Sequence, residues 1–407
     1  MAAAREMVMP PASALGPAGW LKAKLFNTWY NSLLTVLMVT ALFLVLKPTL
    51  IWVFSAADWS PIASNLKLFL VGQYPLDQMW RVGVSVLIFS AVFGVAWAVW
   101  GGVARNFALL IAIGLGALAF VPLSFENLGL EARLWIIANP VAVALGYQVR
   151  RTPLMRPGAA SSRWVVIWAM ASFVLVLVLL RGISWVPWLP QVSTGAWGGL
   201  LLTFLLALVG ILASFPLGVV LALGRRSDLP VVKGLCVLFI ELVRGVPLVS
   251  LLFMTQVIVP LFLPEELRVD RVLRALFAIT LFSSAYMAEN IRGGLQAVPR
   301  GQVEAARALG MNGFHSMFFI VLPQALRAVI PTIAGQFISL FKDTSLVATV
   351  GLLDVLGIGK SIVLGNVEWV GSQREVYIFI ALLFWVFTYS MSYASRRLES
   401  ALGVGQR

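Results

Sequence analysis

The sequence contains almost no residues that form disulfides or bind transition metals. Cysteine and histidine occur once each, as Cys236 and His315. A single cysteine excludes an intrachain disulfide, and the pair falls short of the four nitrogen and sulfur ligands of a structural zinc site. We therefore expect both residues to have structural roles.

Charged residues are also scarce. They make up 12% of the 407 residues, whereas hydrophobic residues make up 60% and the mean hydropathy is +0.93. This composition excludes an ordinary soluble globular domain and predicts a polytopic membrane protein. The net charge is +13, but the basic residues lie at the ends of apolar runs and not on one basic face. They therefore predict membrane topology and no binding of nucleic acid.

Long apolar runs are abundant, and they set the fold class. A helix needs about 20 residues to cross about 30 Å of hydrocarbon at about 1.5 Å per residue. By this measure the sequence predicts an all-α, polytopic transmembrane helical bundle of about ten spans. The expected spans lie near residues 33–54, 82–100, 107–124, 134–148, 164–180, 197–223, 236–263, 272–289, 328–352 and 376–394. The run 134–148 is the weakest of them.

Lysine and arginine near the first span predict the side on which the chain begins. Loops rich in these residues stay in the cytoplasm, and Arg5, Lys22 and Lys24 precede the first span. No run in this part resembles a cleavable export signal. We therefore expect residues 1–32 to form a cytoplasmic tail.

A second basic segment, 150–163, extends the topology. It must also be cytoplasmic, and this requires an even number of preceding spans, which supports a span at 134–148. Counting onward places the loop 290–327 and the carboxyl terminus in the cytoplasm.

The most specific feature is a polar segment between two apolar runs, VEAARALGMNGFHSMFFIVLPQ at 303–324. Its pattern, EAA-x3-G-x9-I-x-LP, is formed by Glu304, Ala305, Ala306, Gly310, Ile320, Leu322 and Pro323. The small alanines allow a short helix to lie close against a partner surface, and the glycine allows a turn between two short helices. On the alanines alone, an amphipathic loop lying on the membrane surface is the alternative.

The whole pattern resembles, without gap or substitution, the cytoplasmic loop signature of ABC-importer permeases. Residues 195–400 resemble the five-span permease core of polar amino-acid ABC importers of the histidine, glutamate and arginine type. Similar segments are IELVRGVPLVSLLF at 240–253, LFSSAYMAENIRGGLQAVPRGQ at 281–302 and FKDTSLVATVG at 341–351. The additional transmembrane region 33–190 resembles that of the long M-type permease of general L-amino-acid importers.

The resemblance implies a permease subunit of an ATP-driven importer that translocates L-amino acids across the bacterial inner membrane. It assigns coupling to the ATPase to Glu304, Ala305, Ala306, Gly310, Leu322 and Pro323. Glu304 is expected either to interact with a charge on the ATPase or to cap the loop helix near its amino-terminal end.

The sequence offers no nucleotide-binding loop of its own. The nearest match, Gly359, Lys360 and Ser361, has Asp354 where the phosphate-binding pattern requires its first glycine. We therefore expect no enzymatic activity and no cofactor bound by this chain. The resemblance implies that ATP and Mg²⁺ are used by a separate dimer of nucleotide-binding ATPase subunits. It further implies a second permease subunit in a heterodimer, a periplasmic amino-acid-binding protein and contact with membrane lipid.

Three groups of polar residues within apolar runs are candidates for the substrate path, because each buried charge costs about a few kcal/mol in a membrane. In the first group, Lys342 and Asp343 precede Thr344 and Ser345, about 20 Å along the span 328–352 by helical rise. Such a set matches the carboxylate and ammonium of an amino acid. A structural Lys–Asp pair facing a subunit interface is the alternative.

The second group is Glu241 and Arg244, and the third is Glu289 with Arg292. Glu241 and Arg244 are three residues apart, just before a glycine and a proline, and predict a broken-helix site. Arg244 lies only about 12 Å into its expected span, so a cytoplasmic gate or a subunit contact remains open. For Glu289 with Arg292, an interfacial pair leading into the loop 290–327 is favoured.

Two other classes of function remain as alternatives. An ion-coupled secondary transporter of small polar solutes usually has two related halves with ion sites near the midplane, whereas the halves of this sequence differ. A membrane-embedded enzyme requires a nucleophile, a base or a metal site, and the sequence has no such cluster.

Overall fold

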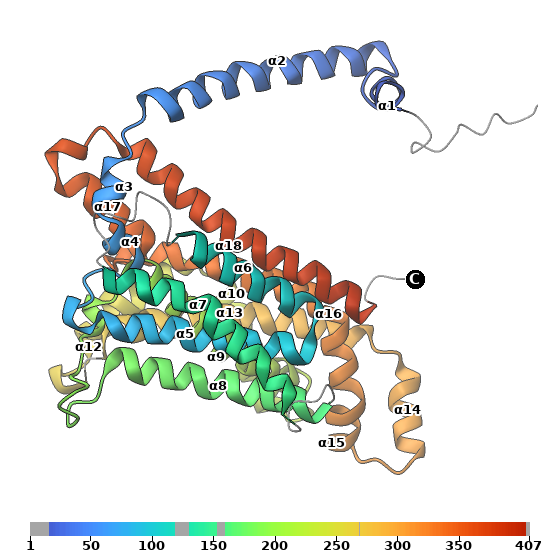
Figure 1. Cartoon of the computed structure of the whole chain (residues 1–407). Helices are drawn as coiled ribbons and strands as arrows, with labels where there is room; N and C mark the ends of the chain where they lie inside the picture. Colours follow the sequence, from blue (N-terminus) through green and yellow to red (C-terminus); the bar gives the residue numbers. More distant parts are fainter. Residues whose placement is uncertain (1–15, 119–129, 153–158, 268, 404–407) are drawn as a thin grey trace, which may run out of the picture. The chain divides into compact units, whose positions relative to one another are not determined.

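The computed structural model describes residues 16–118, 130–152, 159–267 and 269–403. The regular secondary structure in these ranges is helical. Two isolated β-bridges also occur, and they pair Gly72 with Trp197 and Gly199 with Asp354. The chain forms two compact units, Met1–Asp58 and Trp59–Arg407 (Figure 1).

The smaller unit contains one long apolar helix. Its elements are α1 (Pro17–Lys24), α2 (Trp29–Ile51) and the π-helical turn η2 (Trp52–Ala56). The hydroxyl of Thr28 accepts a hydrogen bond from a backbone N–H in the first turn of α2, which is how a threonine typically begins a helix. The first span therefore starts at Trp29, a little before the expected 33–54.

The larger unit contains all the remaining elements. In chain order these are α3 (Ser60–Ser64), α4 (Leu66–Val71), η3 (Leu76–Gln78), α5 (Met79–Trp100), α6 (Gly102–Leu118), α7 (Leu130–Gln148), η5 (Val149–Arg151), α8 (Ala159–Arg181), η7 (Thr194–Ala196), α9 (Gly199–Arg225), α10 (Pro230–Arg244), α11 (Leu248–Phe253), η8 (Met254–Ile258), α12 (Val259–Phe262), η9 (Glu265–Leu267), α13 (Arg271–Ala297), α14 (Arg300–Ala308), α15 (Gly313–His315), η10 (Ser316–Val321), α16 (Leu322–Asp343), η11 (Thr344–Val350), α17 (Val355–Gly365), η12 (Val367–Trp369) and α18 (Gln373–Leu402).

Seven helices within the described ranges are long and apolar enough to cross a membrane. These are Trp29–Ala56, Leu76–Trp100, Ser161–Arg181, Gly199–Arg225, Arg271–Ala297, Gly313–Val350 and Gln373–Ser400. The bent pair Pro230–Arg244 and Leu248–Phe262 makes eight if it is one broken span. The predicted spans 107–124 and 134–148 correspond to α6 and α7, which are not among these candidates, and residues 119–124 lie outside the described ranges. The all-α membrane fold is confirmed, and the number ten stays a prediction.

The predicted span 236–263 is not one straight helix. Its two parts meet at an angle of 104° between Arg244 and Leu248. Pro247 has no N–H to donate and disfavours helical geometry in the residue before it, so the chain breaks there. The depth of Arg244 counted along a straight span is therefore wrong, because α10 begins at Pro230 and the chain changes direction directly after Arg244.

Helices α9, α13 and α16 form the centre of the larger unit. A Cβ at Gly210 would lie 3.3 Å from both Ile279 and Leu340, and one at Gly218 would lie 2.6 Å from Met287. Small residues at such positions allow transmembrane helices to approach closely. Ile279 and Leu340 belong to one buried apolar cluster and Met287 to another, so the core has two levels along α13.

Helices α5 and α7 pack through glycines in the same way. A Cβ at Gly94 would lie 2.2 Å from the carbonyl oxygen of Val143, and one at Gly146 would clash with the backbone of α5. The two helices are also joined by a hydrogen bond of 2.7 Å, which the buried hydroxyl of Ser90 in α5 donates to the side-chain oxygen of Asn139 in α7. These contacts fix the register of the two helices.

Residues 59–190 and 195–400 belong to the same compact unit. The side-chain amide of Asn106 in α6 donates to the hydroxyl of Tyr393 in α18 at 3.1 Å, and Phe69 in α4 contacts Phe379 in α18 with ring centroids 5.2 Å apart. The larger compact unit thus contains residues from both expected regions, and the division between 33–190 and 195–400 stays a prediction.

Candidate functional site

The α14–α15 loop (298–321) joins α13 to α16 and contains two short helices. Pro299 precedes α14, and Gly310 follows it with φ of +75°, a left-handed conformation that favours glycine. Asn312 then begins α15, because its side chain accepts a hydrogen bond of 2.8 Å from the N–H of His315. Figure 1 shows α14 and α15 at one end of the larger unit. The turn expected at Gly310 is therefore present.

The predicted coupling residues divide into exposed and buried sets. Glu304 and Ala305 are exposed on α14, whereas Ala306 is only 3% exposed and packs inward. Leu322 is buried in the apolar cluster of α13 and α16, and Pro323 is exposed in the first turn of α16. The small side chain of Ala306 thus sets how closely α14 approaches this chain's own helices, and Ala305 remains available to a partner.

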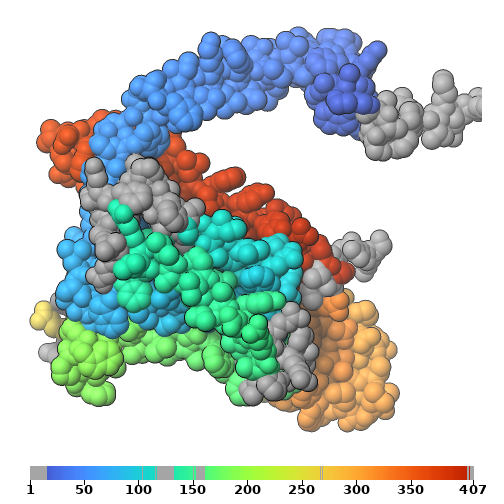
Figure 2. All heavy atoms as spheres, in the orientation of Figure 1, coloured from blue at the N-terminus to red at the C-terminus, as the bar shows by residue number. Residues whose placement is uncertain are grey.

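Glu304 does not cap the loop helix. It is the fifth residue of α14, and the first turn of that helix contains no acidic residue. Its side chain is exposed. Of the two roles expected for Glu304, the geometry leaves the interaction with a partner. Figure 2 shows the loop in orange on the outside of the larger unit.

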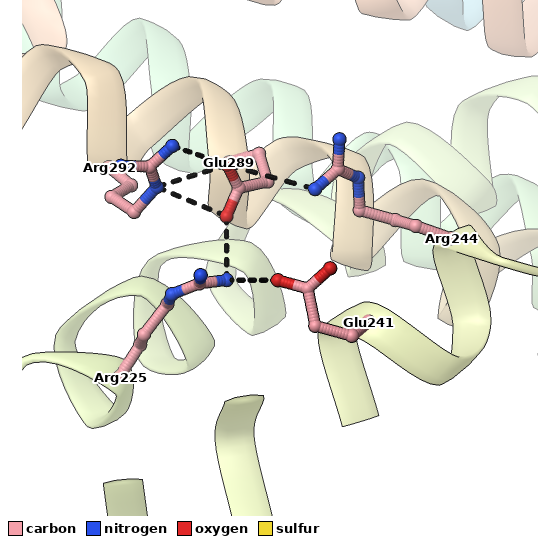
Figure 3. Close-up of polar contacts among 5 residues, drawn as sticks. All are labelled: Arg225, Glu241, Arg244, Glu289 and Arg292. Carbon is pink, nitrogen blue, oxygen red and sulfur yellow. Dashed lines mark hydrogen bonds and ion pairs between the residues drawn. The ribbon is translucent and has the colours of Figure 1, made fainter. Parts of the chain in front are cut away.

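Behind this loop, five charged side chains from three helices converge (Figure 3). Arg225, the last residue of α9, lies 2.9 Å from Glu241 of α10 and 2.8 Å from Glu289 of α13. Arg292 donates to the Glu289 carboxylate at 2.8 to 3.1 Å. Arg244 Nη1 lies 3.7 Å from Glu289 Oε2. We call these five residues the arginine–glutamate cluster.

Glu289 is the centre of this cluster. Its side chain is 15% exposed, and it faces three arginines that are 24 to 34% exposed. Partial burial weakens screening by water and salt, so these interactions are stronger than those of surface pairs. The guanidinium of Arg244 also lies over the ring of Tyr286, 5.5 Å from its centroid. The cluster therefore joins the ends of α9 and α10 to α13, a few residues before the α14–α15 loop.

The structure brings three of the predicted path residues together, namely Glu241, Arg244 and Glu289. The sequence interpretation paired Glu289 with Arg292 but used Arg225 only as a topology signal. Two glutamates and two arginines already balance in charge, so nothing in the sequence pointed to a third arginine. Only the fold shows that Arg225 interacts with both carboxylates.

The other predicted path residues lie elsewhere. Lys342 and Asp343 end α16, and the preceding Leu340 packs at the level of Ile279 in α13. Glu289 is ten residues further along α13, about 15 Å by helical rise. The two groups therefore do not form one site within this chain.

The hydroxyl groups beside Lys342 and Asp343 are engaged by their own helix. Thr344 is buried and donates to the carbonyl oxygen of Phe341 at 2.7 Å. Ser345 donates to the carbonyl oxygen of Lys342 at 2.8 Å. Lys342 is exposed and Asp343 is half-buried. The charged groups of Lys342 and Asp343 are therefore more available to a solute than the hydroxyl protons of Thr344 and Ser345, which are already donated to backbone carbonyl oxygens.

The sequence Gly359, Lys360 and Ser361 does not form a phosphate-binding loop. It lies within α17, and a Cβ at Gly359 would meet Ile380 and Val376 of α18 at 2.5 and 2.9 Å. The glycine therefore serves helix packing.

Comparison with known proteins identifies the family. Residues 214–404 match the family described as "Binding-protein-dependent transport system inner membrane component". The chain is 35% identical over 404 residues to the inner membrane amino-acid ABC transporter permease protein YhdY of Escherichia coli, covering 95% of this chain and 93% of that protein. It is 34% identical to the glutamate/glutamine/aspartate/asparagine transport system permease protein BztC of Rhodobacter capsulatus, covering 98% and 97%.

A shorter relative matches about half of the chain. The probable glutamine ABC transporter permease protein GlnP of Bacillus subtilis is 36% identical over 204 residues, which cover 50% of this chain and 91% of that protein. The similarity to YhdY and BztC, in contrast, extends through the additional amino-terminal region. The chain belongs to the permease subunits of binding-protein-dependent amino-acid ABC transporters, multi-pass inner-membrane proteins whose ATP is hydrolysed by separate subunits.

Proposed function

We propose that this chain carries L-amino acids into the cell as one permease subunit of an ATP-driven importer, and that the α14–α15 loop couples it to the ATPase. The observation that carries the coupling role is the geometry of α14. Glu304 and Ala305 are exposed, and Ala306 anchors the helix from its other side. A short helix held in this way can transmit a displacement to α13 and α16, which flank the loop.

The proposed assembly has four kinds of protein subunit. A dimer of nucleotide-binding subunits holds ATP and Mg²⁺ and contacts the loop, so this chain needs no cofactor of its own. A second, different permease lies beside this one, and a periplasmic binding protein delivers the amino acid. Among the relatives, GlnP and GlnM of Bacillus subtilis are both named as permease proteins of a glutamine ABC transporter, which supports a pair of unlike permeases.

The proposed orientation places both termini and the α14–α15 loop in the cytoplasm. Lys22 and Lys24 before the first span, and Arg396 and Arg397 near the end of the last, support this orientation through the retention of positive charge. The loop itself carries Arg300 and Arg307.

We further propose that the substrate path passes Lys342 and Asp343 and continues toward the arginine–glutamate cluster. Charged groups of both signs at two levels along α13 suit a solute with an ammonium and a carboxylate. Because Arg225 pairs with both Glu241 and Glu289, and Arg244 pairs with Glu289, the cluster acts as a closed cytoplasmic gate. The gate opens when α13 moves with the loop and these ion pairs separate.

The experiment is amino-acid-stimulated ATP hydrolysis and uptake in proteoliposomes that contain the assembled transporter and its binding protein. Glu304→Arg reverses the charge of the exposed coupling residue and should abolish the stimulation while leaving the permease folded. The matched control is Glu368→Arg, the same change at an exposed glutamate in η12, outside the loop. Wild-type stimulation by Glu304→Arg would refute the coupling role. Uptake that follows an ion gradient without any ATPase would instead support a secondary transporter.

A further inference from the structure

A cavity of about 590 Å³ lies on the inner side of the α14–α15 loop. Its walls come from the turn between α9 and α10, the end of α13, the helix α14 and the turn η10. Val303 faces it from α14 and Met317 from η10. The volume lies within the usual range for small-molecule sites.

The polar lining of this cavity is strongly basic. Arg226, Arg300 and Arg307 line it, against a single carboxylate, Asp228. Arg300 and Arg307 lie on the same face of α14 as Val303, since residues three and four apart in a helix are neighbours. Glu304, four residues after Arg300 and three before Arg307, is exposed beside these two arginines, and it is not among the described residues that line the cavity.

These three arginines differ from those of the arginine–glutamate cluster in their partners. Arg225 is held by two glutamates, whereas the next residue, Arg226, donates to the carbonyl oxygen of Leu295, at 3.4 Å. No ion pair joins Arg226, Arg300 or Arg307 to a carboxylate within the part of the chain that the structure describes. Several guanidinium groups around one cavity without carboxylate partners favour an anion, and planar guanidinium groups suit phosphate oxygens in particular.

The neighbouring helix α10 indicates where that anion comes from. Val231, Leu235, Leu238 and Leu242 follow a spacing of four, three and four residues and are 62 to 73% exposed. Such a stripe on a membrane protein faces lipid chains. It begins three residues after Asp228, so the cavity lies at the end of a lipid-facing helix, where a headgroup is expected.

We propose that this cavity binds the phosphate of an anionic phospholipid headgroup, with Arg226, Arg300 and Arg307 donating to its oxygens and the acyl chains lying along α10. Basic pockets between helices on the cytoplasmic side of a membrane are suited to such headgroups. The bound phosphate links α14 to the turn after α9, and it thereby holds the loop helix against the bundle. Free inorganic phosphate presents the same chemistry without acyl chains, so the test must separate these two sources.

The test measures binding to the purified full-length chain in a neutral detergent by native mass spectrometry. The probes are phosphatidylglycerol and phosphatidylcholine with identical acyl chains. We expect one phosphatidylglycerol to bind with a clear preference over phosphatidylcholine. Replacing each of the three arginines with glutamine should weaken it by roughly fivefold, and the triple variant by roughly a hundredfold. The matched control is Lys233→Gln, which removes one positive charge near the start of α10 without lining the cavity, and should retain the preference.

Each result decides the proposal. A triple variant that keeps the wild-type preference for phosphatidylglycerol would overturn the proposal. A wild-type chain without this preference would also overturn it, and that result does not depend on whether the variants fold. Inorganic phosphate that displaces phosphatidylglycerol at equal concentration would support the phosphate site but overturn its assignment to lipid. Loss of the bound lipid on adding the purified ATPase would overturn it for the assembled transporter and assign the arginines to the partner. No readout requires transport, so the result is independent of the proposed function.

Discussion

Replacing Glu289 with glutamine removes the carboxylate charge around which the arginine–glutamate cluster is built. The side chain keeps its size, but Arg225, Arg244 and Arg292 lose the group that they share, and only Glu241 remains to offset their three positive charges. The change therefore combines the loss of charge-assisted hydrogen bonds with repulsion between partly buried guanidinium groups.

The expected cost follows from the exposure of the partners. Removing one member of a fully buried ion pair costs about 3–5 kcal/mol, and an exposed pair contributes about 0–1 kcal/mol. Glu289 is 15% exposed and its arginines are 24 to 34% exposed. We therefore expect Glu289→Gln to lower the free energy of unfolding by about 2–3 kcal/mol.

Glu241→Gln is the matched comparison within the same cluster. Glu241 is 53% exposed and, among the described residues, forms an ion pair with Arg225 alone, so the same chemical change should cost less than about 1 kcal/mol. The assay is unfolding of the full-length chain in mixed micelles with increasing denaturing detergent, followed by circular dichroism. Equal costs for the two variants, or a cost below about 0.5 kcal/mol for Glu289→Gln, would refute the assignment of Glu289 as the centre of the cluster.

Three further changes test other parts of the structure. Gly310→Val forces a branched residue into a left-handed conformation, which costs about 1–2 kcal/mol, and should impair stimulated ATP hydrolysis. Gly313→Val, at a position with open space and an ordinary backbone, should impair it less. Equal effects of the two changes would contradict the turn geometry. Gly94→Leu should destabilise the protein by about several kcal/mol, because a Cβ there would lie 2.2 Å from a backbone oxygen of α7. A Cβ at Gly114 would have nothing within 4 Å, so Gly114→Leu should be tolerated. Thermal unfolding of the two variants measures the difference. Asp354→Ala should lower the free energy of unfolding by about 1–2 kcal/mol, because the side chain of Asp354 accepts hydrogen bonds from two backbone N–H groups at the start of α17. Asp354→Asn should restore most of this loss. An unchanged unfolding midpoint for the alanine variant would exclude the capping role.

The additional amino-terminal region illustrates a limit of sequence interpretation. Sequence resemblance separates 33–190 from 195–400, and the family match at 214–404 covers most of the second part and extends slightly beyond it. The fold nevertheless places residues from both parts in one compact unit, through contacts such as Phe69 with Phe379. A resemblance reports which segment is shared with shorter relatives, and it carries no information on which segments pack together.

The sequence by itself determined the features that are written in contiguous residues. Apolar runs of sufficient length predict membrane helices wherever they occur, and the pattern from Glu304 to Pro323 predicts the α14–α15 loop with its turn at Gly310, because helix length and backbone freedom are local properties. Only the tertiary structure decided which helices meet. Helices in a membrane are apolar on nearly all faces, so their hydrophobic pattern does not distinguish a partner helix from lipid. The meeting of Arg225, Glu241 and Glu289, from helices up to 64 residues apart in the chain, and the basic cavity behind α14 therefore became visible only in the fold.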